Sequence, residues 1–552
     1  MLSIAVRLTR YAGWFALLAS SGVIVVTIVW QSIDGFGAVD MPTARLRRLF
    51  VNTIWMSACA TVMALGLAIP AAFALVQARR EWQRQCLLVL TIIPLMTMPS
   101  VFAYAWLLLA TSSHPLIQQL TRLVGWNSPG AEPFHAAWVL ATWLWPIPAL
   151  IMAVSFKHIG AATYRLACVD ASAVRAFFFG ALPVMRAPLI AACAIVFILA
   201  AIDSTVPPLM LSFDVWAVEM VAQAGMARHD ARASAHLLLM EWPMLVMLAL
   251  FVLSAMPGIR QMAAWADDVG AGDTGLNPKT ASWVWGVALI LVAAVTVFPI
   301  VVFVTTMASG RYPPAESFQR AFDAVRSQGS STLIVMLAAA ACALAVSLTV
   351  VDGPGWPRPL RIAGVIAVGL VLTTAVLPPP LIGTALISFY ADENISPSDR
   401  WNLYENTPTV WVAAMLARFV FIPVCIMRLL NRRVPQDVVD QARADGASRI
   451  QSLACARLPM LWRSWLAGAM LVACLTLSEV VASELVQPPQ WGGGSLAVQV
   501  DGFMHYGRHN QTIAMGMMMM APAVPAAVLM LSLVGLPDRR RIIRAARDKK
   551  AL

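Results

Sequence analysis

Hydrophobic residues occur in long, nearly unbroken runs, without the short-period alternation with polar residues that marks soluble strands and helices. A helix needs roughly 20 mostly apolar residues to cross the hydrocarbon core of a bilayer. Twelve runs meet this condition, at 11–30, 51–77, 86–111, 134–156, 187–211, 236–256, 282–308, 330–351, 362–389, 410–427, 464–486 and 511–536. The pattern predicts an all-α polytopic membrane protein with about twelve transmembrane helices.

The composition agrees with this prediction. Hydrophobic residues make up 60% of the 552 residues and charged residues 12%, about half of the ~25% charged share of soluble domains. Disordered, collagenous and disulfide-scaffold classes are excluded by the same figures. The first apolar run is long enough to span and lacks a small-residue cleavage site, so we expect it to remain as an anchor. The eight cysteines form no CxxC pair, and we expect free thiols with no disulfide, metal cluster or cofactor.

The net charge of +11 does not indicate nucleic-acid binding, because the basic residues lie in loops between the apolar runs. With the N-terminus in the cytoplasm, 27 of the 39 Lys and Arg residues fall on the cytoplasmic side and 11 on the other, with Arg418 inside a span. This asymmetry predicts a multi-pass protein of the plasma (inner) membrane with both termini cytoplasmic. One cluster, Arg45, Arg47 and Arg48, falls on the wrong side, and we interpret it as the flank of an interfacial segment.

The chain contains an internal repeat. Leu182-Pro183 and Leu458-Pro459 each lie in a cytoplasmic loop, and Asp203 and Glu479 each follow 20 residues after the proline. AVEM-x7-RHD (217–230) matches AVQV-x7-RHN (497–510) without a gap. The repeat predicts two parallel six-span halves, a first half at 1–256 and a second half at 282–536. A cytoplasmic linker at 257–281 joins them, and a basic cytoplasmic tail follows at 537–552.

The cytoplasmic loop of the second half, residues 440–459, carries the most specific motif. Its spacing fits E-A-A-x3-G-x9-I-x-L-P, with Asp440, Gln441, Ala442, Gly446, Leu458 and Pro459 at the matching positions. This motif resembles the signature of bacterial binding-protein-dependent ABC transporter permeases, in which the loop forms a coupling helix that docks into the ATPase. Gly446 permits a left-handed turn between two short helices, and Pro459 can begin the next helix. An ordinary amphipathic loop is the alternative.

The corresponding loop of the first half, residues 164–183, is a degraded copy. Asp170 stands where the second loop has Gly446, and Leu182 and Pro183 end the loop. No G-x4-G-K-[ST] phosphate loop occurs, since Lys279-Thr280 follows a proline. The resemblance therefore implies a non-enzymatic permease that works with two copies of a separate ATPase subunit and with a solute-binding protein.

Residues 478–507 indicate a branch of that family. They look like the iron(III) and thiamine branch of fused permeases, although Val481 and Gln490 stand where glycines are usual, and residues 200–211 resemble the matching segment of the first half. The resemblance implies iron(III) or a related small cationic solute, with thiamine or a polyamine as alternatives. Asp203 and Glu479 are the candidate path residues, because intramembrane acids usually face a bundle interior or a watery path. The alternative is that both are interfacial or pair with backbone groups.

Other polar and soft side chains have weaker interpretations. We expect Arg418 to form a structural ion pair, and we expect the outer-side His229, His505 and His509 to contact a binding protein more readily than a metal. The methionines of 515–520 fit packing better than copper binding. An ion-coupled secondary transporter also uses two six-span halves and would have buried coupling acids without paired coupling loops. A membrane enzyme would need a cluster of catalytic polar residues, which the sequence does not show.

Overall fold

The computed structural model describes residues 2–34, 43–78, 81–111, 119, 132–156, 161–172, 175–210, 214–227, 246–247, 249–254, 257, 278–308, 313–351, 357–391, 403–431, 434–489, 491 and 493–533. The secondary structure of these residues is helical and includes no strand. The all-α prediction is therefore confirmed. The predicted tail, most of the linker and part of the span at 236–256 lie outside the described residues.

Six helices of the described part are long and apolar enough to cross a membrane, and up to eleven spans result if each bent pair of helices counts as one. The six are Ser3–Gln31, Ala44–Val76, Pro314–Thr349, Arg358–Val376, Arg449–Ser478 and His509–Leu533. The five bent pairs break at prolines or beside them in most cases, because proline removes a backbone hydrogen bond and clashes with the preceding turn. These elements are those of a polytopic membrane protein.

Four predicted spans have different bounds in the structure. The run at 86–111 is divided into α4 (Glu81–Ile92) and α5 (Pro99–Ala110), which belong to a pair bent by 95°. The run at 362–389 is divided into α18 (Arg358–Val376) and α19 (Pro379–Tyr390). The runs at 187–211 and 464–486 end early, with α12 (Arg186–Ala201) and α25 (Leu458–Ser478). Apolar composition continues through each break, so hydropathy does not reveal it.

Helix α3 (Thr43–Gln77) begins earlier than the predicted span and carries the misplaced basic cluster. Its extension pairs with acids near the start of α14 (Trp216–Ala227). Arg45 Nη2 lies 2.7 Å from Glu219 Oε2, and Arg48 Nη2 lies 2.9 Å from Asp214 Oδ2. Arg45 and Arg48 are therefore paired with acids of the same chain.

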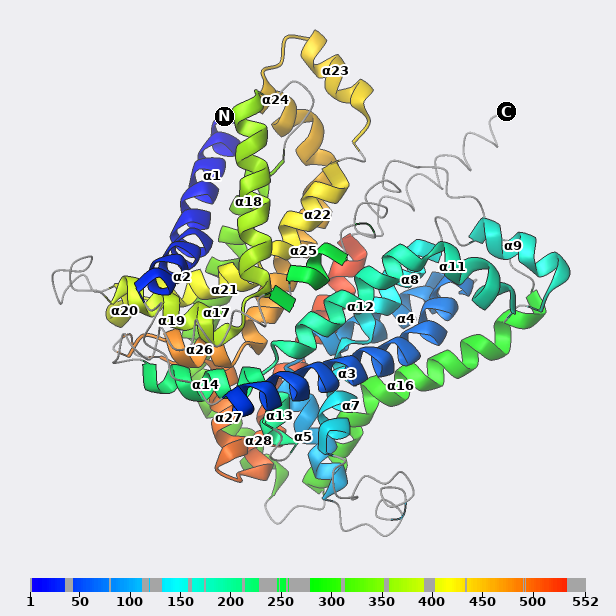
Figure 1. Ribbon diagram of the computed structural model, residues 1–552, viewed down its shortest axis with the longest axis vertical. Coiled ribbons are helices and arrows are strands. Elements are labelled where there is room, and N and C mark those ends of the chain that lie inside the picture. The colour runs from blue at the N-terminus through cyan, green and yellow to red at the C-terminus, as the bar shows by residue number, and fades with distance from the viewer. Residues whose placement is uncertain are drawn as a thin grey trace.

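The ribbon separates into two arms that diverge toward α23 and α9 (Figure 1). Each arm contains helices from both halves of the sequence. Helices α1 (Leu2–Leu17) and α2 (Val23–Asp34) pack on α17 (Pro314–Thr349) and α19, respectively, while α16 (Pro278–Ala308) packs on α3. The first span of each half thus lies against the other half.

The remaining elements position the loops and breaks described below. They are α7 (Glu132–Leu144), α8 (Pro146–Ser155), α9 (Ala161–Asp170), η4 (Ala176–Ala181), α11 (Leu182–Val184), α13 (Val206–Leu209), α20 (Leu403–Asn406), α21 (Thr409–Phe419), α22 (Phe421–Asn431), α23 (Gln436–Ala444), α24 (Arg449–Ser452), η6 (Leu453–Arg457), α26 (Val481–Val486), α27 (Leu496–His505) and α28 (His509–Met520), with η1 (Leu18–Gly22) and η2 (Ile93–Met96) inside the first and third predicted spans. The largest hydrophobic cluster contains side chains from both halves, among them Leu17, Trp216 and Trp411. The two halves therefore share a core.

Candidate functional site

The loop of the second half (residues 440–459, hereafter the second loop) contains a short helix and a turn at a glycine, and it leads into the next apolar helix. Asp440, Gln441 and Ala442 lie in α23, and the Asp440 carboxylate is exposed and 3.4 Å from Arg443 Nη1. Gly446 has φ +84, its N–H donates to Arg443 O, and the next N–H donates to Ala442 O. This is the Schellman arrangement that favours glycine after a helix. The sequence reasoning for Gly446 is therefore confirmed at the level of backbone conformation.

The rest of this loop is anchored by packing. Ser448 caps α24 in a reciprocal capping box with Gln451. Val439 and Leu453 are buried together in one hydrophobic cluster. Leu458 and Pro459 are the first residues of α25, which continues from the π-helical turn η6 without a break, and the π-helical turn directly before Pro459 changes the hydrogen-bond pattern where the proline has no N–H. The loop is thus held by a cap and by buried apolar side chains, and it leaves one face of α23 exposed.

In the described residues, the loop of the first half (164–183, hereafter the first loop) also begins with a helix, α9, and ends in a π-helical turn before the next helix. Asp170 is the last residue of α9, so the helix continues to the position that aligns with Gly446. A non-glycine residue disfavours a left-handed turn there, which accounts for the difference. The π-helical turn η4 then leads to Leu182 and Pro183 at the start of α11, as η6 leads to Leu458 in the second loop.

The exposed surfaces of the two loops differ in chemistry. In the first loop Leu166, Val169 and Phe179 are 72%, 80% and 82% exposed. Tyr164 of the same loop is buried against Phe73 and Phe156 and holds α9 in place. The exposed part of α23 in the second loop is mainly polar. The first loop therefore presents an apolar surface where the second presents a polar one.

Glu479 lies directly after the end of α25, in extended backbone between two helices. Its Oε1 accepts a hydrogen bond of 3.2 Å from the N–H of Ala482 in α26. Its Oε2 lies 2.7 Å from Arg418 Nε, and the two side chains are 9% and 17% exposed. The expectation that Arg418 forms an ion pair is met, and its partner is one of the candidate path acids.

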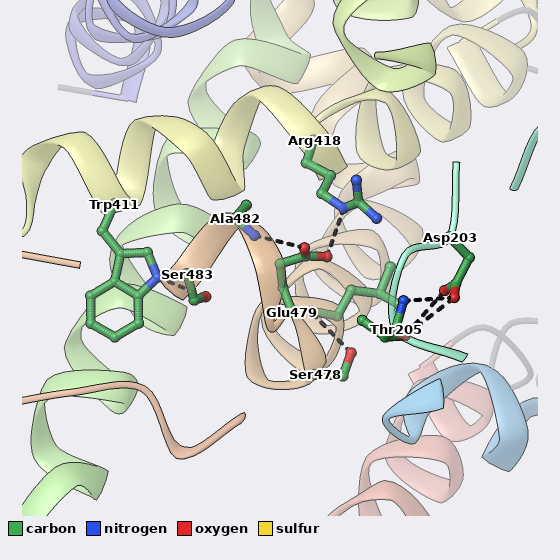
Figure 2. Close-up of polar contacts among 9 residues, drawn as sticks. Asp203, Thr205, Trp411, Arg418, Ser478, Glu479, Ala482 and Ser483 are labelled. Carbon is green, nitrogen blue, oxygen red and sulfur yellow. Dashed lines mark hydrogen bonds and ion pairs between the residues drawn. The ribbon is translucent and has the colours of Figure 1, made fainter. Parts of the chain in front are cut away.

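Asp203 has the equivalent place in the first half, directly after α12. Its Oδ1 accepts hydrogen bonds from the N–H groups of Val206 at 2.9 Å and Thr205 at 3.1 Å. Both acids thus cap the short helix that follows a broken span, as the alternative of backbone pairing predicted. In the described residues no ion pair joins Asp203 to Arg418, whose carboxylate partner is Glu479. Figure 2 shows the Glu479 carboxylate directed at Arg418 and the Asp203 carboxylate directed at Thr205.

The cluster of Asp203, Arg418 and Glu479, hereafter the acid–arginine cluster, joins the two halves. Two of its members come from the second half and one from the first. The Nη1 atom of Arg418 is buried without a hydrogen-bond partner in the described part of the chain. The Nε atom is likewise without a hydrogen bond of good geometry and contacts Glu479 as an ion pair. The cluster therefore holds two carboxylates and one guanidinium that is only partly satisfied by hydrogen bonds.

A second pair of contacts repeats between the halves. Thr53 Oγ1 accepts the N–H of Trp216 at 2.9 Å, and Thr332 Oγ1 accepts the N–H of Leu496 at 3.1 Å. Each threonine thus ties a long helix, α3 or α17, to the start of the second helix after the acid, α14 or α27. The sequence analysis did not identify these contacts, because a threonine in an apolar run does not reveal which N–H group it accepts.

The histidines and methionines play local roles in the described residues. His509 Nδ1 hydrogen-bonds the Tyr104 hydroxyl, and His505 lies 3.2 Å from Asp501, while His229 lies outside the described part. Met515, Met519 and Met520 are buried in a hydrophobic cluster. No group of three potential metal ligands occurs among the residues that the structure describes.

The comparison with known families concerns the second half. Residues 358–541 match the model of the binding-protein-dependent transport system inner membrane component. The match supports a permease of a binding-protein-dependent ABC transporter. It includes the second loop, Arg418 and Glu479, and the matched family is a transport component of the membrane, not a catalytic one. No curated protein and no solved structure matches the chain.

The permease match begins at the first residue of α18 and extends beyond the last described helix. The printed match covers residues of the second half. In the first half, Asp203 stands at the repeat position of Glu479. Arg418 is a difference between the halves, since the aligned residue of the first half is the buried Thr142.

Proposed function

We propose that the chain is the permease of an ATP-driven importer, formed by two fused six-span halves at 1–256 and 282–536. Two copies of a separate ATPase bind the first and second loops. A solute-binding protein delivers iron(III) or a related small cationic solute at the opposite face. The observation that carries the proposal is the second loop, in which the family motif coincides with a short exposed helix and a glycine turn.

The repeat of contacts supports the fused two-half arrangement. The threonine contacts at Trp216 and Leu496 and the acid caps of α13 and α26 occur at equivalent positions. The first span of each half packs on a helix of the other half, α1 on α17 and α16 on α3. One ATPase copy for each loop is the stoichiometry that this arrangement favours, with both termini and both loops in the cytoplasm.

The acid–arginine cluster supports a cationic solute. Two buried carboxylates from different halves lie in one region with one guanidinium, which pairs with Glu479, so the cluster has a net charge of −1 when all three groups are ionised. A negative site partly offsets the dehydration of a cation that enters a medium of low dielectric constant. Iron(III) prefers oxygen ligands, which carboxylates supply.

The test is uptake by cells or proteoliposomes that carry Asp203→Asn, Glu479→Gln or both, measured with iron(III) and with thiamine and normalised to membrane protein. The double variant is expected to lose most uptake of the transported solute, and Asp203→Asn alone to lose less. Glu479→Gln costs more than Asp203→Asn because it leaves Arg418 buried without its partner. Full uptake by the double variant removes the cluster from the proposed path.

The ion-coupled secondary transporter remains the second candidate because it, too, predicts buried acids, and Asp203 and Glu479 are 7% and 8% exposed. It gives no reason for two loops that each begin with a short helix and lead through a π-helical turn into the next helix. Uptake after ATP depletion with an imposed ion gradient separates the two candidates, since only a secondary transporter continues to work.

A further inference from the structure

We propose that Arg418 is a fixed positive charge that keeps small inorganic cations out of the resting permeation path. The inference rests on the proposed function in one respect, that Asp203 and Glu479 line that path. It concerns what the path excludes when no solute is delivered, and not which solute is carried.

The need for such a charge follows from the acids. Two carboxylates near the ends of broken spans, with no cation between them, would attract any small cation that reached them. The Arg418 guanidinium pairs with Glu479 at 2.7 Å, in the same region of the structure as Asp203 (Figure 2). It is therefore an internal substitute for a cation. A fixed arginine forms an electrostatic barrier of this kind in channels that exclude cations.

The position of Arg418 also allows its withdrawal. It lies at the end of α21, beside the 46° bend to α22. Helix α21 contacts the segment after α25 at two points. One is the Arg418–Glu479 ion pair, and the other is two turns earlier, where Trp411 Nε1 donates to Ser483 Oγ at 3.0 Å. Arg418 Nη1 has no hydrogen-bond partner among the described residues, and within α21 the guanidinium contacts the Phe419 ring, 5.6 Å from its centroid, so the ion pair with Glu479 is its main tie to another segment. A movement at this bend would separate Arg418 from Glu479 and free both acids for the solute.

The asymmetry between the halves argues against a purely structural ion pair. The first half has the same break and the same acid cap at Asp203, yet Thr142 stands at the position of Arg418 and donates to Val139 O at 2.8 Å. The break and cap are therefore formed without a paired arginine in one half. What Arg418 adds is charge, placed where it acts on the acids of both halves.

The test measures passive K⁺ and Cl⁻ leak from liposomes that contain the whole 552-residue chain, without ATP and without binding protein. The ionised cluster has net charge −1 in the wild type, −2 in Arg418→Gln, −1 in Arg418→Gln/Glu479→Gln and 0 in Glu479→Gln. K⁺ leak is expected to rise with the negative charge: lowest in Glu479→Gln, equal in the wild type and the double variant, and highest in Arg418→Gln. The expected leak of Arg418→Gln is about tenfold above wild type, which corresponds to a barrier lower by about 1.4 kcal/mol. Cl⁻ leak is expected to stay unchanged.

Two single variants serve as matched controls. Arg418→Lys keeps the charge and is expected to keep the wild-type leak. Arg428→Gln removes a partly buried arginine ten residues further along the same bent pair and is expected to have no effect on K⁺ leak. A structural role would instead raise the leak of both ions, and Glu479→Gln would not reverse it.

Equal K⁺ leak in wild type and Arg418→Gln, with both proteins folded, overturns the proposal. If Arg418→Gln does not fold, the same comparison is made between Glu479→Gln and the double variant, where equal leaks overturn it as well. The outcome is independent of the proposed importer activity, because neither ATP nor a transported solute enters the measurement. Loss of ATP-driven uptake with an intact leak order would contradict the importer and leave the barrier in place.

Discussion

Gly13 permits the closest contact between the first span of the chain and the second half. A Cβ atom at this position would lie 2.2 Å from the carbonyl oxygen of Ala345 and 2.9 Å from Thr349 Cγ2. Ordinary contacts between a carbon and a carbonyl oxygen are about 3.4 Å. Gly13→Ala therefore forces α1 and α17 apart by about 1 Å, and because the nearest atom belongs to the backbone, no side-chain rotation relieves the clash.

The expected cost of Gly13→Ala is about 1–3 kcal/mol, the range for overpacked buried contacts. Gly66 in α3 provides the matched control, since nothing lies within 4 Å of the place that a Cβ atom would take there. At Gly66 the same substitution is expected to stabilise the helix by about 0.5–1 kcal/mol. Thr349→Ser in the Gly13→Ala background removes one clash and leaves the carbonyl clash, so it is expected to restore only part of the loss.

The assay is the temperature at which the purified protein in detergent loses its monodisperse peak. Gly13→Ala is expected to lower this temperature and Gly66→Ala to leave it unchanged or raise it. Equal temperatures for the two variants would refute the reasoning that the first span of the chain packs tightly on the second half.

The other predictions concern the loops, the threonine contacts and the orientation. Gly446→Val, at φ +84, is expected to distort the second loop and reduce co-purification of the ATPase, while membrane insertion is unchanged; equal co-purification would sink the coupling assignment. Thr53→Val removes the hydroxyl that accepts the Trp216 N–H and is expected to lower stability by about 0.5–1.5 kcal/mol, whereas Thr53→Ser keeps this acceptor. Indistinguishable melting of the two variants would count against this contact. Cys168 and Cys455 are exposed, so a membrane-impermeant thiol reagent added to intact cells is expected to spare both and to label them after permeabilisation, while a cysteine placed at 501 is expected to react from outside. Labelling of either native cysteine in intact cells would reverse the proposed orientation.

Much of the fold could be predicted from the sequence because the membrane imposes one simple requirement. Runs of apolar residues must be helical where they cross lipid, so the class and most span positions followed from hydropathy. The breaks could not be predicted in this way. The 95° bend before Pro99 lies inside a run that is apolar throughout. Hydropathy averaged over a window of residues gives no information on a change in the direction of the chain.

The candidate site was predictable in its parts but not in its assembly. The repeat identified Asp203 and Glu479, and an arginine inside an apolar run required a partner. That the partner is Glu479, 61 positions further along the chain, depends on how α21 packs beside the end of α25. The backbone caps had a local signal as well, since Asp203 precedes a proline at 207 that can begin a helix. The chemistry of the exposed first-loop surface depends on which side chains its packing leaves outside.

The most direct test of the proposed function is uptake by proteoliposomes that contain the chain with its ATPase, supplied with the loaded binding protein. The account predicts uptake that requires ATP on the side of the first and second loops, stops with Gly446→Val, and persists when all ion gradients are dissipated. Uptake that continues without ATP and collapses with the ion gradient would contradict it.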